Sequence, residues 1–313
     1  MLGITCRDIK YFIRKISIIG QHLRKIWHLL TGKKDSIRIA LENWETIWQN
    51  PRYPYSWTKD YYLQNFIAEI DLETGFLFVK NQGQKLFFPK TYTRQRCSMC
   101  ACDTALEMDL LSPHRYVTKE NKMYGTLERA ESEIPKEIPF FVEKGDIVAD
   151  IGASHGNFGI SVIENAKHIY LFECDEIWNE PLQKTFEKYK DKVTIVNKYV
   201  SDVNGENSVT LDTFFKDKEI NFIKADVEGY EQQLLNGARN ILSTRSNVKC
   251  SICTYHKPQD ARDFENFFKE LGYETYFTEG YMFCPINNTQ ENTSFLRKAI
   301  IRTMHNFSIE RRS

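Results

Sequence analysis

The 313-residue sequence has no net charge, because 42 lysines and arginines balance 42 aspartates and glutamates. Composition therefore gives no reason to expect a nucleic-acid partner, which usually selects for excess positive charge. No uninterrupted apolar run reaches the roughly 18 residues that a membrane-spanning helix needs. No export signal is visible, since no apolar core precedes a small-residue cleavage site. We therefore expect a cytoplasmic chain whose 8 cysteines are reduced.

The sequence also has no internal repeat and no long low-complexity tract. Hydrophobic residues make up 42% and charged residues 27%, which is typical of a globular protein. The length suits one large α/β domain with an appendage, or two domains.

Residues 1–34 form a distinct basic segment. Apolar residues recur there at helical spacing, and lysines and arginines fill much of the remainder. This pattern predicts an amphipathic helix that could lie on an anionic membrane surface through residues 7–30, at the inner face of the membrane. The same stripe could instead pack on the body of the protein, or on a partner helix.

Residues 35–140 are predicted to form an α+β extension that could act as a substrate or lid region. Residues 36–49 have a helical pattern, and residues 75–89 contain two short β runs around a polar turn with Gly83, which predicts a hairpin. Cys97, Cys100 and Cys102 follow, and with His114 they could complete a zinc site. We disfavour zinc, because only one such cysteine cluster exists. Cys250 and Cys253 are expected on opposite faces of a buried strand, as small apolar residues.

From residue 141 to 303 the pattern alternates between strand and helix, and a polar tail follows at 304–313. This alternation predicts a parallel sheet with helices on both faces. The expected strands are 146–151, 168–173, 193–200, 221–226 and 248–255. The expected helices are 156–166, 177–190, 230–243 and 260–271. Two further β-like runs, 273–284 and 294–303, have no helical pattern between them, so the sheet is expected to end in a hairpin-like pair.

The stretch 147–159 predicts a buried strand, a tight turn and the start of a helix. Asp150 ends the apolar run, and Gly152 and Gly156 flank the turn. Gly152 has no Cβ, so a ligand can approach its backbone closely, and the helix start offers unpaired N–H groups. A dinucleotide fingerprint would need a glycine where Ser154 stands. An NAD-dependent oxidoreductase is therefore disfavoured, while a purely structural turn remains an alternative.

Acidic side chains follow the next three expected strands. Glu173 lies about 20 residues beyond the turn, where a carboxylate can accept the hydroxyls of a ribose. Asp202 could accept a hydrogen bond from an adenine amino group, although Asp-x-x-Gly is equally a common turn. Asp226 and Glu228 end an apolar strand, and such neighbouring carboxylates need a cation, a proton or a polar ligand to coexist.

His256 closes the fifth expected strand at the same edge of the sheet. An ordinary histidine pKa of about 6.5 suits a general base, although a lone histidine is often structural. Glu231 is explained by the preference of helix N-termini for acidic residues.

The stretch from about Ser112 to Thr303 resembles the FkbM-type methyltransferases. The matching pieces, in chain order, are Ser112–Tyr116, Asp150–Gly156, Phe172-Glu173, Val200–Asp202, Thr210–Asp212, Lys224–Gly229 and Gly237-Ala238. The resemblance implies the Rossmann-like, seven-stranded class I methyltransferase sheet with an antiparallel last strand. It also implies that S-adenosylmethionine is the cofactor, and the residues implied to bind it are Asp150, Gly152, Ser154, Gly156, Glu173, Asp202 and Asp226.

The expected reaction is O-methylation of a hydroxyl on a sugar, a glycan or a similar small molecule. The acceptor oxygen must be aligned with the methyl group and must lose its proton. His256 is the candidate base, and Asp226 or Glu228 could orient it or act as an alternative base. A divalent cation between the two carboxylates is compatible with the sequence but not required by it. The alternative is a non-catalytic protein of the same fold that serves as a scaffold in a membrane-associated glycan assembly.

Overall fold

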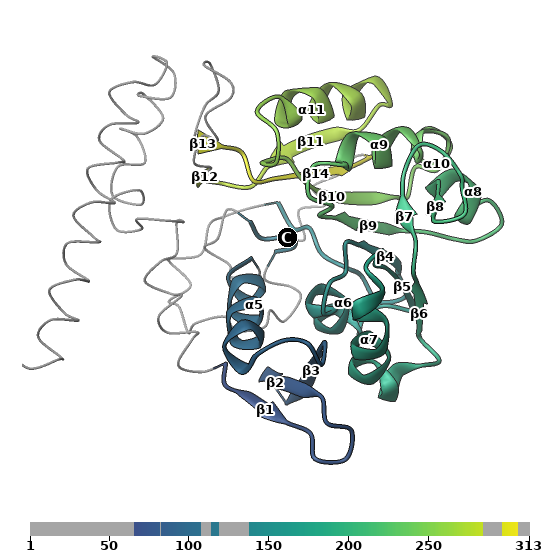
Figure 1. The fold of residues 1–313 in the computed structure, drawn as a ribbon. Helices are drawn as coiled ribbons and strands as arrows, with labels where there is room; N and C mark the ends of the chain where they lie inside the picture. The colour runs from purple at the N-terminus through teal and green to yellow at the C-terminus, as the bar shows by residue number, and fades with distance from the viewer. Residues whose placement is uncertain (1–65, 82, 108–113, 119–137, 284–295, 306–313) are drawn as a thin grey trace, which may run out of the picture.

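A computed structural model describes residues 66–81, 83–107, 114–118, 138–283 and 296–305 of the chain (Figure 1). The basic segment 1–34 and the expected helix 36–49 lie outside these residues, as does most of the expected polar tail. In the described part, no helix combines the length and the hydrophobicity that crossing a membrane would require.

The centre of the fold is a seven-stranded sheet. Its strands are β4 (Ile147–Ile151), β5 (His168–Phe172), β6 (Val193–Val196), β9 (Phe222–Ala225), β10 (Lys249–Cys253), β11 (Glu274–Phe277) and β14 (Ile300–Met304). They are arranged in the order β11-β14-β10-β9-β4-β5-β6. Neighbours from β10 to β6 pair in parallel, whereas β14 runs antiparallel to both β10 and β11. The predicted α/β fold class, with seven strands and an antiparallel last strand, is confirmed.

Helices cover both faces of this sheet (Figure 1). Helices α6 (Asn157–Val162) and α7 (Asn179–Thr185) lie on one face, and α8 (Leu211–Phe214), α9 (Glu231–Asn236), α10 (Arg239–Thr244) and α11 (Asp260–Glu270) lie on the other. Strand β4 shows why both faces are needed, since all five of its residues are buried. Val148 packs in one core and Ala149 in the other, because successive side chains of a strand point to opposite faces. Cys250 and Cys253 also divide between the two cores, as predicted.

Several expected elements are shorter in the structure than in the prediction, among them the helices expected at 156–166 and 177–190, which correspond to α6 and α7. The expected strand 193–200 ends at Val196, and β7 (Tyr199–Val200) pairs separately with β8 (Ser208–Val209). The expected helix 230–243 is divided into α9 and α10 at Gly237. A Cβ atom added to Gly237 would lie 2.0 Å from the carbonyl oxygen of Ser201, so the chain needs glycine at this crossing.

Asp212 stabilises the break between α9 and α10. Its two carboxylate oxygens accept the backbone N–H groups of Asn240 and Ile241, which begin α10. Its own N–H donates to the carbonyl of Gly237. The start of α8 and the start of α10 are therefore joined by hydrogen bonds that an uninterrupted helix would not offer.

The described residues of the N-terminal extension form a three-stranded antiparallel sheet and one helix. Strands β1 (Ala68–Ile70), β2 (Leu77–Asn81) and β3 (Gln84–Phe88) pair in chain order, and the predicted hairpin is β2–β3. The sheet packs against α7, where the N–H of Phe87 donates to Thr185 Oγ1. Helix α5 (Arg94–Glu107) was not predicted, and the cysteine cluster from Cys97 falls on it.

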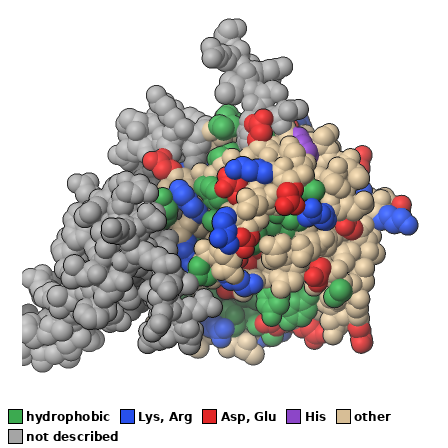
Figure 2. Space-filling view, turned by 90° about the horizontal axis from the view of Figure 1, so that it is seen from above, with side chains coloured by type: hydrophobic (Ala, Val, Ile, Leu, Met, Phe, Trp, Pro, Cys, Tyr) green, Lys and Arg blue, Asp and Glu red, His purple; other side chains and the backbone are tan. Residues whose placement is uncertain are grey.

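Charges of both signs are mixed on the face seen from above in Figure 2, where lysines and arginines alternate with aspartates and glutamates. This distribution agrees with the zero net charge of the sequence.

At the C-terminal end, Met304 still belongs to β14, so the expected domain boundary at residue 303 falls inside a strand.

We predict that Gly237→Ala lowers the free energy of unfolding by about 1–3 kcal/mol, because the new methyl group would overlap the Ser201 carbonyl. Gly205→Ala is the matched control, since the nearest obstacle there is the movable Ser208 hydroxyl. Denaturant unfolding of both variants checks this, and equal stability of the two would contradict the close approach.

Candidate active site

A cavity of about 650 Å³ opens at the carboxyl ends of the central parallel strands. Five of the predicted site residues line it: Gly152, Ser154, Glu173, Asp226 and Glu228. They come from the ends of β4, β5 and β9, where open α/β sheets bind their ligands. The volume lies within the usual range for a small-molecule site.

The turn after β4 needs glycine at position 152. Gly152 has φ +73°, and an added Cβ atom would lie 1.8 Å from the carbonyl oxygen of Asp226. The N–H groups of Gly152 and Ala153 both donate to the carbonyl of Phe172, at 3.0 and 3.1 Å. The turn is therefore held between the end of β5 and the end of β9.

Asp150 lies behind this turn and does not line the cavity. Its side chain is fully buried, and its Oδ2 accepts the N–H of Gly159 in α6. Gly156 also lies outside the lining, with φ +79°, and a Cβ atom there would meet the rings and methyl groups of Phe186 and Leu182. These two predicted cofactor residues therefore act on a ligand only through the turn that they support.

Lys224 is the buried cation that pairs with Asp150. Its Nζ lies 3.1 Å from Asp150 Oδ1 and donates to the carbonyl of Gly152 at 3.0 Å. Burial alone would lower the pKa of this ammonium, but Asp150 and Asp226 raise it above its ordinary value. Lys224 is therefore charged, and it ties β9 to the turn after β4.

Glu173 lines the cavity from the end of β5. Its Oε2 accepts the N–H of Ser154 at 2.8 Å, and its Oε1 accepts the N–H of Asp175 at 2.9 Å. Burial raises the pKa of this carboxyl group, and the two backbone donors oppose that effect. Ser154 has φ +47°, so the backbone bends to bring its N–H to the glutamate.

Asp202 is exposed and does not line the cavity. Its Oδ1 accepts the hydroxyl of Ser201, whereas Tyr199, Val200 and Ser201 do reach the lining. The adenine-binding role of Asp202 stays a prediction. For that role, the side chain of Asp202 would have to turn toward the cavity wall formed by Tyr199, Val200 and Ser201.

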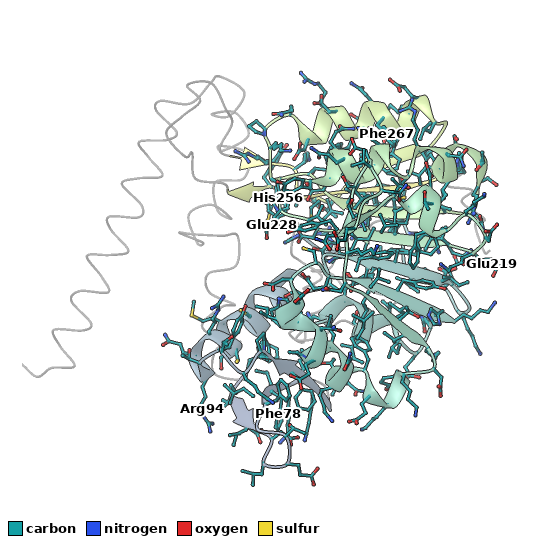
Figure 3. The ribbon with its side chains drawn as sticks, turned by 45° about the vertical axis from the view of Figure 1, so that its right-hand side comes forward. Phe78, Arg94, Glu219, Glu228, His256 and Phe267 are labelled. Carbon is teal, nitrogen blue, oxygen red and sulfur yellow. The ribbon has the colours of Figure 1, made fainter. Side chains whose placement is uncertain are left out.

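The three predicted catalytic residues lie together. Figure 3 shows Glu228 and His256 close to each other, with Glu219 at the opposite end of the sheet. Nε2 of His256 lies 3.5 Å from Asp226 Oδ1 and 3.6 Å from Glu228 Oε2. The Glu228 side chain is 91% exposed, whereas His256 and Asp226 are largely buried.

Glu231 holds the other nitrogen of His256. Its Oε1 lies 2.8 Å from Nδ1 and also accepts the N–H groups of Val227 and Gly229. Burial alone would lower the pKa of His256, but its contact with Glu231 and the charges of Asp226 and Glu228 raise it above the ordinary value. The preference of a helix start for acidic residues therefore explains only part of why Glu231 occurs here.

Asp226 is surrounded by donors and positive charge. Tyr116 donates its hydroxyl to Asp226 Oδ2 at 2.8 Å, and His114 Nε2 lies 3.5 Å from the same oxygen. Burial would raise the pKa of this carboxyl group, but the contact with His114 and the charge of Lys224 hold it below the ordinary value. Asp226 is therefore ionised.

Two groups of side chains have the spacing that a metal ion could use. Asp226, Glu228 and His256 each offer an atom within 4.8 Å of the others, and so do His114, Asp226 and Cys253. Exposed carboxylates such as Glu228 commonly bind no ion, so this spacing alone does not indicate a metal site.

The contacts of His114 and Cys97 do not support the disfavoured alternative of a zinc site at the cysteine cluster. His114 lies against Cys253, with Nε2 3.3 Å from Sγ, while Cys97 is buried in the core. Among the described side chains, the groups with the spacing of metal ligands include neither Cys97 nor Cys100.

Sequence reasoning gave no role to Lys224, Glu231, Tyr116 or His155. Lys224 carried a usable signal, because a charge inside the apolar run Phe222–Ala225 is costly unless it is paired. Tyr116 and His155 lie within the stretches Ser112–Tyr116 and Asp150–Gly156 that carry the family resemblance, but nothing in the sequence singled out their side chains. His155 is buried, lines the cavity and stacks on Phe88 of the extension at 5.2 Å between ring centres.

The strand order, with β14 antiparallel between β10 and β11, defines a methyltransferase fold of the class I type. Residues 200–275 match the family model described as the methyltransferase FkbM domain. The predicted resemblance is confirmed over this stretch, which carries β8, β9 and β10 and includes Asp202, Asp226, Glu228 and His256.

Solved methyltransferase structures resemble the chain in part. An FkbM methyltransferase from Methylobacillus flagellatus is 22% identical with a TM-score of 0.41, over 51% of this chain and 43% of that one. An rRNA methylase from Streptococcus thermophilus is 14% identical with a TM-score of 0.37, over 52% and 89%. Aeropyrum pernix fibrillarin, solved with S-adenosyl-L-methionine, is 13% identical with a TM-score of 0.37, over 54% and 70%. At these values the likeness says nothing about what this chain binds. No curated protein sequence matches it.

We predict that Lys224→Met lowers the free energy of unfolding by about 3–5 kcal/mol, because it leaves the Asp150 carboxylate buried without its partner. The double variant Asp150→Asn, Lys224→Met removes both charges and should recover much of this loss. Lys167→Met is the control, since its pair with Glu219 is exposed. Denaturant unfolding of these proteins and of the single variant Asp150→Asn measures the coupling, and additive losses would contradict it.

Proposed function

We propose that the protein transfers a methyl group from S-adenosylmethionine to a hydroxyl oxygen of a small molecule or glycan. One observation carries the proposal. A single cavity is lined on one side by the turn of Gly152 and Glu173, and on the other by Asp226 and Glu228. A ligand in the turn would thus face the side chains that can accept a proton.

The residues of the cavity fit the proposed cofactor. Each oxygen of Glu173 already accepts one backbone N–H, and each keeps a lone pair for a ribose hydroxyl. Gly152 leaves its backbone open to the methionine part, because no side chain stands there. Bound S-adenosylmethionine would supply an electrophilic methyl group. The ionised Asp226 would lie on the same side as the positive sulfonium, which favours its binding.

His256 is the proposed base. Glu231 holds the proton of a neutral imidazole on Nδ1, and Nε2 faces Asp226 and Glu228. Because these two carboxylates line the cavity and His256 does not, the acceptor would pass its proton to Nε2 through one of them. Once protonated, the ring would be stabilised by Asp226 and Glu228, whose oxygens lie 3.5 and 3.6 Å from Nε2. This arrangement parallels other bases that are oriented by a carboxylate.

The charges around the base favour a neutral acceptor. Asp226, Glu228 and Glu231 would repel a phosphate or another anion, including a nucleic-acid backbone. Tyr199 and Tyr230 line the cavity although they are 57% and 62% exposed, so their rings are available to an acceptor. A sugar hydroxyl matches both features, and the FkbM resemblance favours the same class.

The site of action is a further part of this proposal. Residues 7–30 would hold the protein at the inner membrane surface, beside a lipid-linked acceptor, while the rest of the chain works in the cytoplasm. This segment lies outside the described residues, and its amphipathic pattern is the support for the idea.

We predict that the protein binds S-adenosylmethionine and that Glu173→Ala weakens binding about tenfold or more, because two ribose hydroxyls lose a charged acceptor. Glu219→Ala, at the opposite end of the sheet, should bind as the wild type does. Isothermal titration calorimetry measures all three proteins. Absence of binding by the wild type would refute the proposed cofactor.

We predict that His256→Ala lowers methyl transfer by about 10²- to 10⁴-fold, the usual contribution of a general base, while S-adenosylmethionine still binds. The assay follows labelled methyl from the cofactor into a cell extract. His168→Ala is the control, because that histidine lies at the amino end of β5. Cofactor binding without transfer by the wild type would favour the scaffold alternative instead.

A further inference from the structure

The short segment 114–118 is fixed onto the sheet beside the catalytic residues. Arg302 of β14, which is fully buried, donates to the carbonyls of Arg115 and Val117 at 2.7 and 3.2 Å. Ser251 of β10 donates to the carbonyl of Tyr116 at 2.9 Å. Two strands therefore set the position of the Tyr116 backbone.

The side chain of Tyr116 reaches the cavity from this anchored backbone. Its ring packs edge-on against Phe158 at 5.6 Å, and the Nζ of Lys224 lies 5.0 Å from the ring centre. Its hydroxyl donates to Asp226 Oδ2 at 2.8 Å. Tyr116 is almost completely buried, so water does not compete for this hydrogen bond.

His114 completes the arrangement behind the tyrosine. Its Nε2 lies 3.2 Å from the Tyr116 hydroxyl oxygen. Burial lowers the pKa of His114, so the ring is neutral and carries one N–H. Because Tyr116 gives its only proton to Asp226, its oxygen can accept from a tautomer that holds the proton on Nε2. The chain of donors then runs from His114 through Tyr116 to Asp226.

This chain of donors distinguishes the two oxygens of Asp226. Oδ2 is occupied by Tyr116, and Oδ1 faces Nε2 of His256 at 3.5 Å. The buried charge of Lys224 would otherwise attract the carboxylate away from the imidazole. We propose that Tyr116 is a positioning residue, which holds the Asp226 carboxylate toward His256 through its hydroxyl. The inference rests on the proposed methyl transfer, since the position of Asp226 matters to the reaction only if His256 is its base.

Several other groups face His256, and a test has to leave them unchanged. They are Glu228 and Glu231 around α9, Asp260 at the start of α11, the adjacent Lys257, and His114. Tyr116→Phe keeps all of them and removes one oxygen atom. A change in the titration of His256 in this variant would therefore report on Asp226.

The test is NMR titration of the full-length chain labelled at its histidines, with the His256 signal assigned from the His256→Ala spectrum. In Tyr116→Phe we expect the carboxylate to turn away, so the pKa of His256 falls, with at least a twofold loss in its proton-binding constant. Asp226→Asn should shift it in the same direction and sets the full size of the effect. Tyr273→Phe, which removes another buried hydroxyl remote from the cavity, should leave it unchanged.

An unchanged or raised pKa of His256 in folded Tyr116→Phe would overturn the proposal. Tyr116→Met, which also lacks the hydroxyl, replaces Tyr116→Phe if that variant does not fold, with the same expectation and the same contradicting outcome. The titration needs no methyl acceptor, so it stands apart from the proposed function. Where transfer is detected, Tyr116→Phe should lower the rate while S-adenosylmethionine binding is retained.

Discussion

The site depends on one buried ion pair, between Lys224 and Asp150. The pair joins two neighbouring strands, and each partner also makes a second contact. Lys224 holds the carbonyl of Gly152, and Asp150 holds the first turn of α6. Burial of two charges is costly, so the pair persists only because their hydrogen bonds are made within the protein. The turn that faces the cavity is thereby held from behind by Asp150, which does not line the cavity, and from its side by Lys224, which does.

A second consequence of this pair is the electrostatic balance of the cavity. The contact with His114 and the charge of Lys224 keep Asp226 ionised deep in the protein, and Asp226 in turn helps to raise the pKa of His256. Glu231 fixes the same imidazole from the opposite side. The turn after β4 and the imidazole of His256 are thus connected through a short series of charged contacts, and a change in one of them alters the protonation of the others.

Most of the central sheet could be predicted from the sequence, because buried parallel strands appear as short apolar runs between helical patterns. Carboxylates that directly follow such runs could be placed at one edge for the same reason. Asp202 and Asp150 show the limit, since position along a strand does not tell whether a side chain turns toward the cavity or away from it. Tyr116 and His155 come from segments whose neighbours in space are far away in sequence, and no periodicity reports such contacts. Helix α5 has little apolar stripe to reveal it, because most of its described residues are polar or small.

The place of β14 has a consequence for how the protein matures during synthesis. This strand is the last of the sheet in the chain, yet it lies between β10 and β11, and it carries the Arg302 that anchors the segment around Tyr116. A growing chain can form β4 to β10 early, but β10 keeps an unpaired edge until β14 has been synthesised. The pocket is therefore completed only when β14 joins the sheet, because Arg302 then anchors the segment around Tyr116 beside the acidic centre.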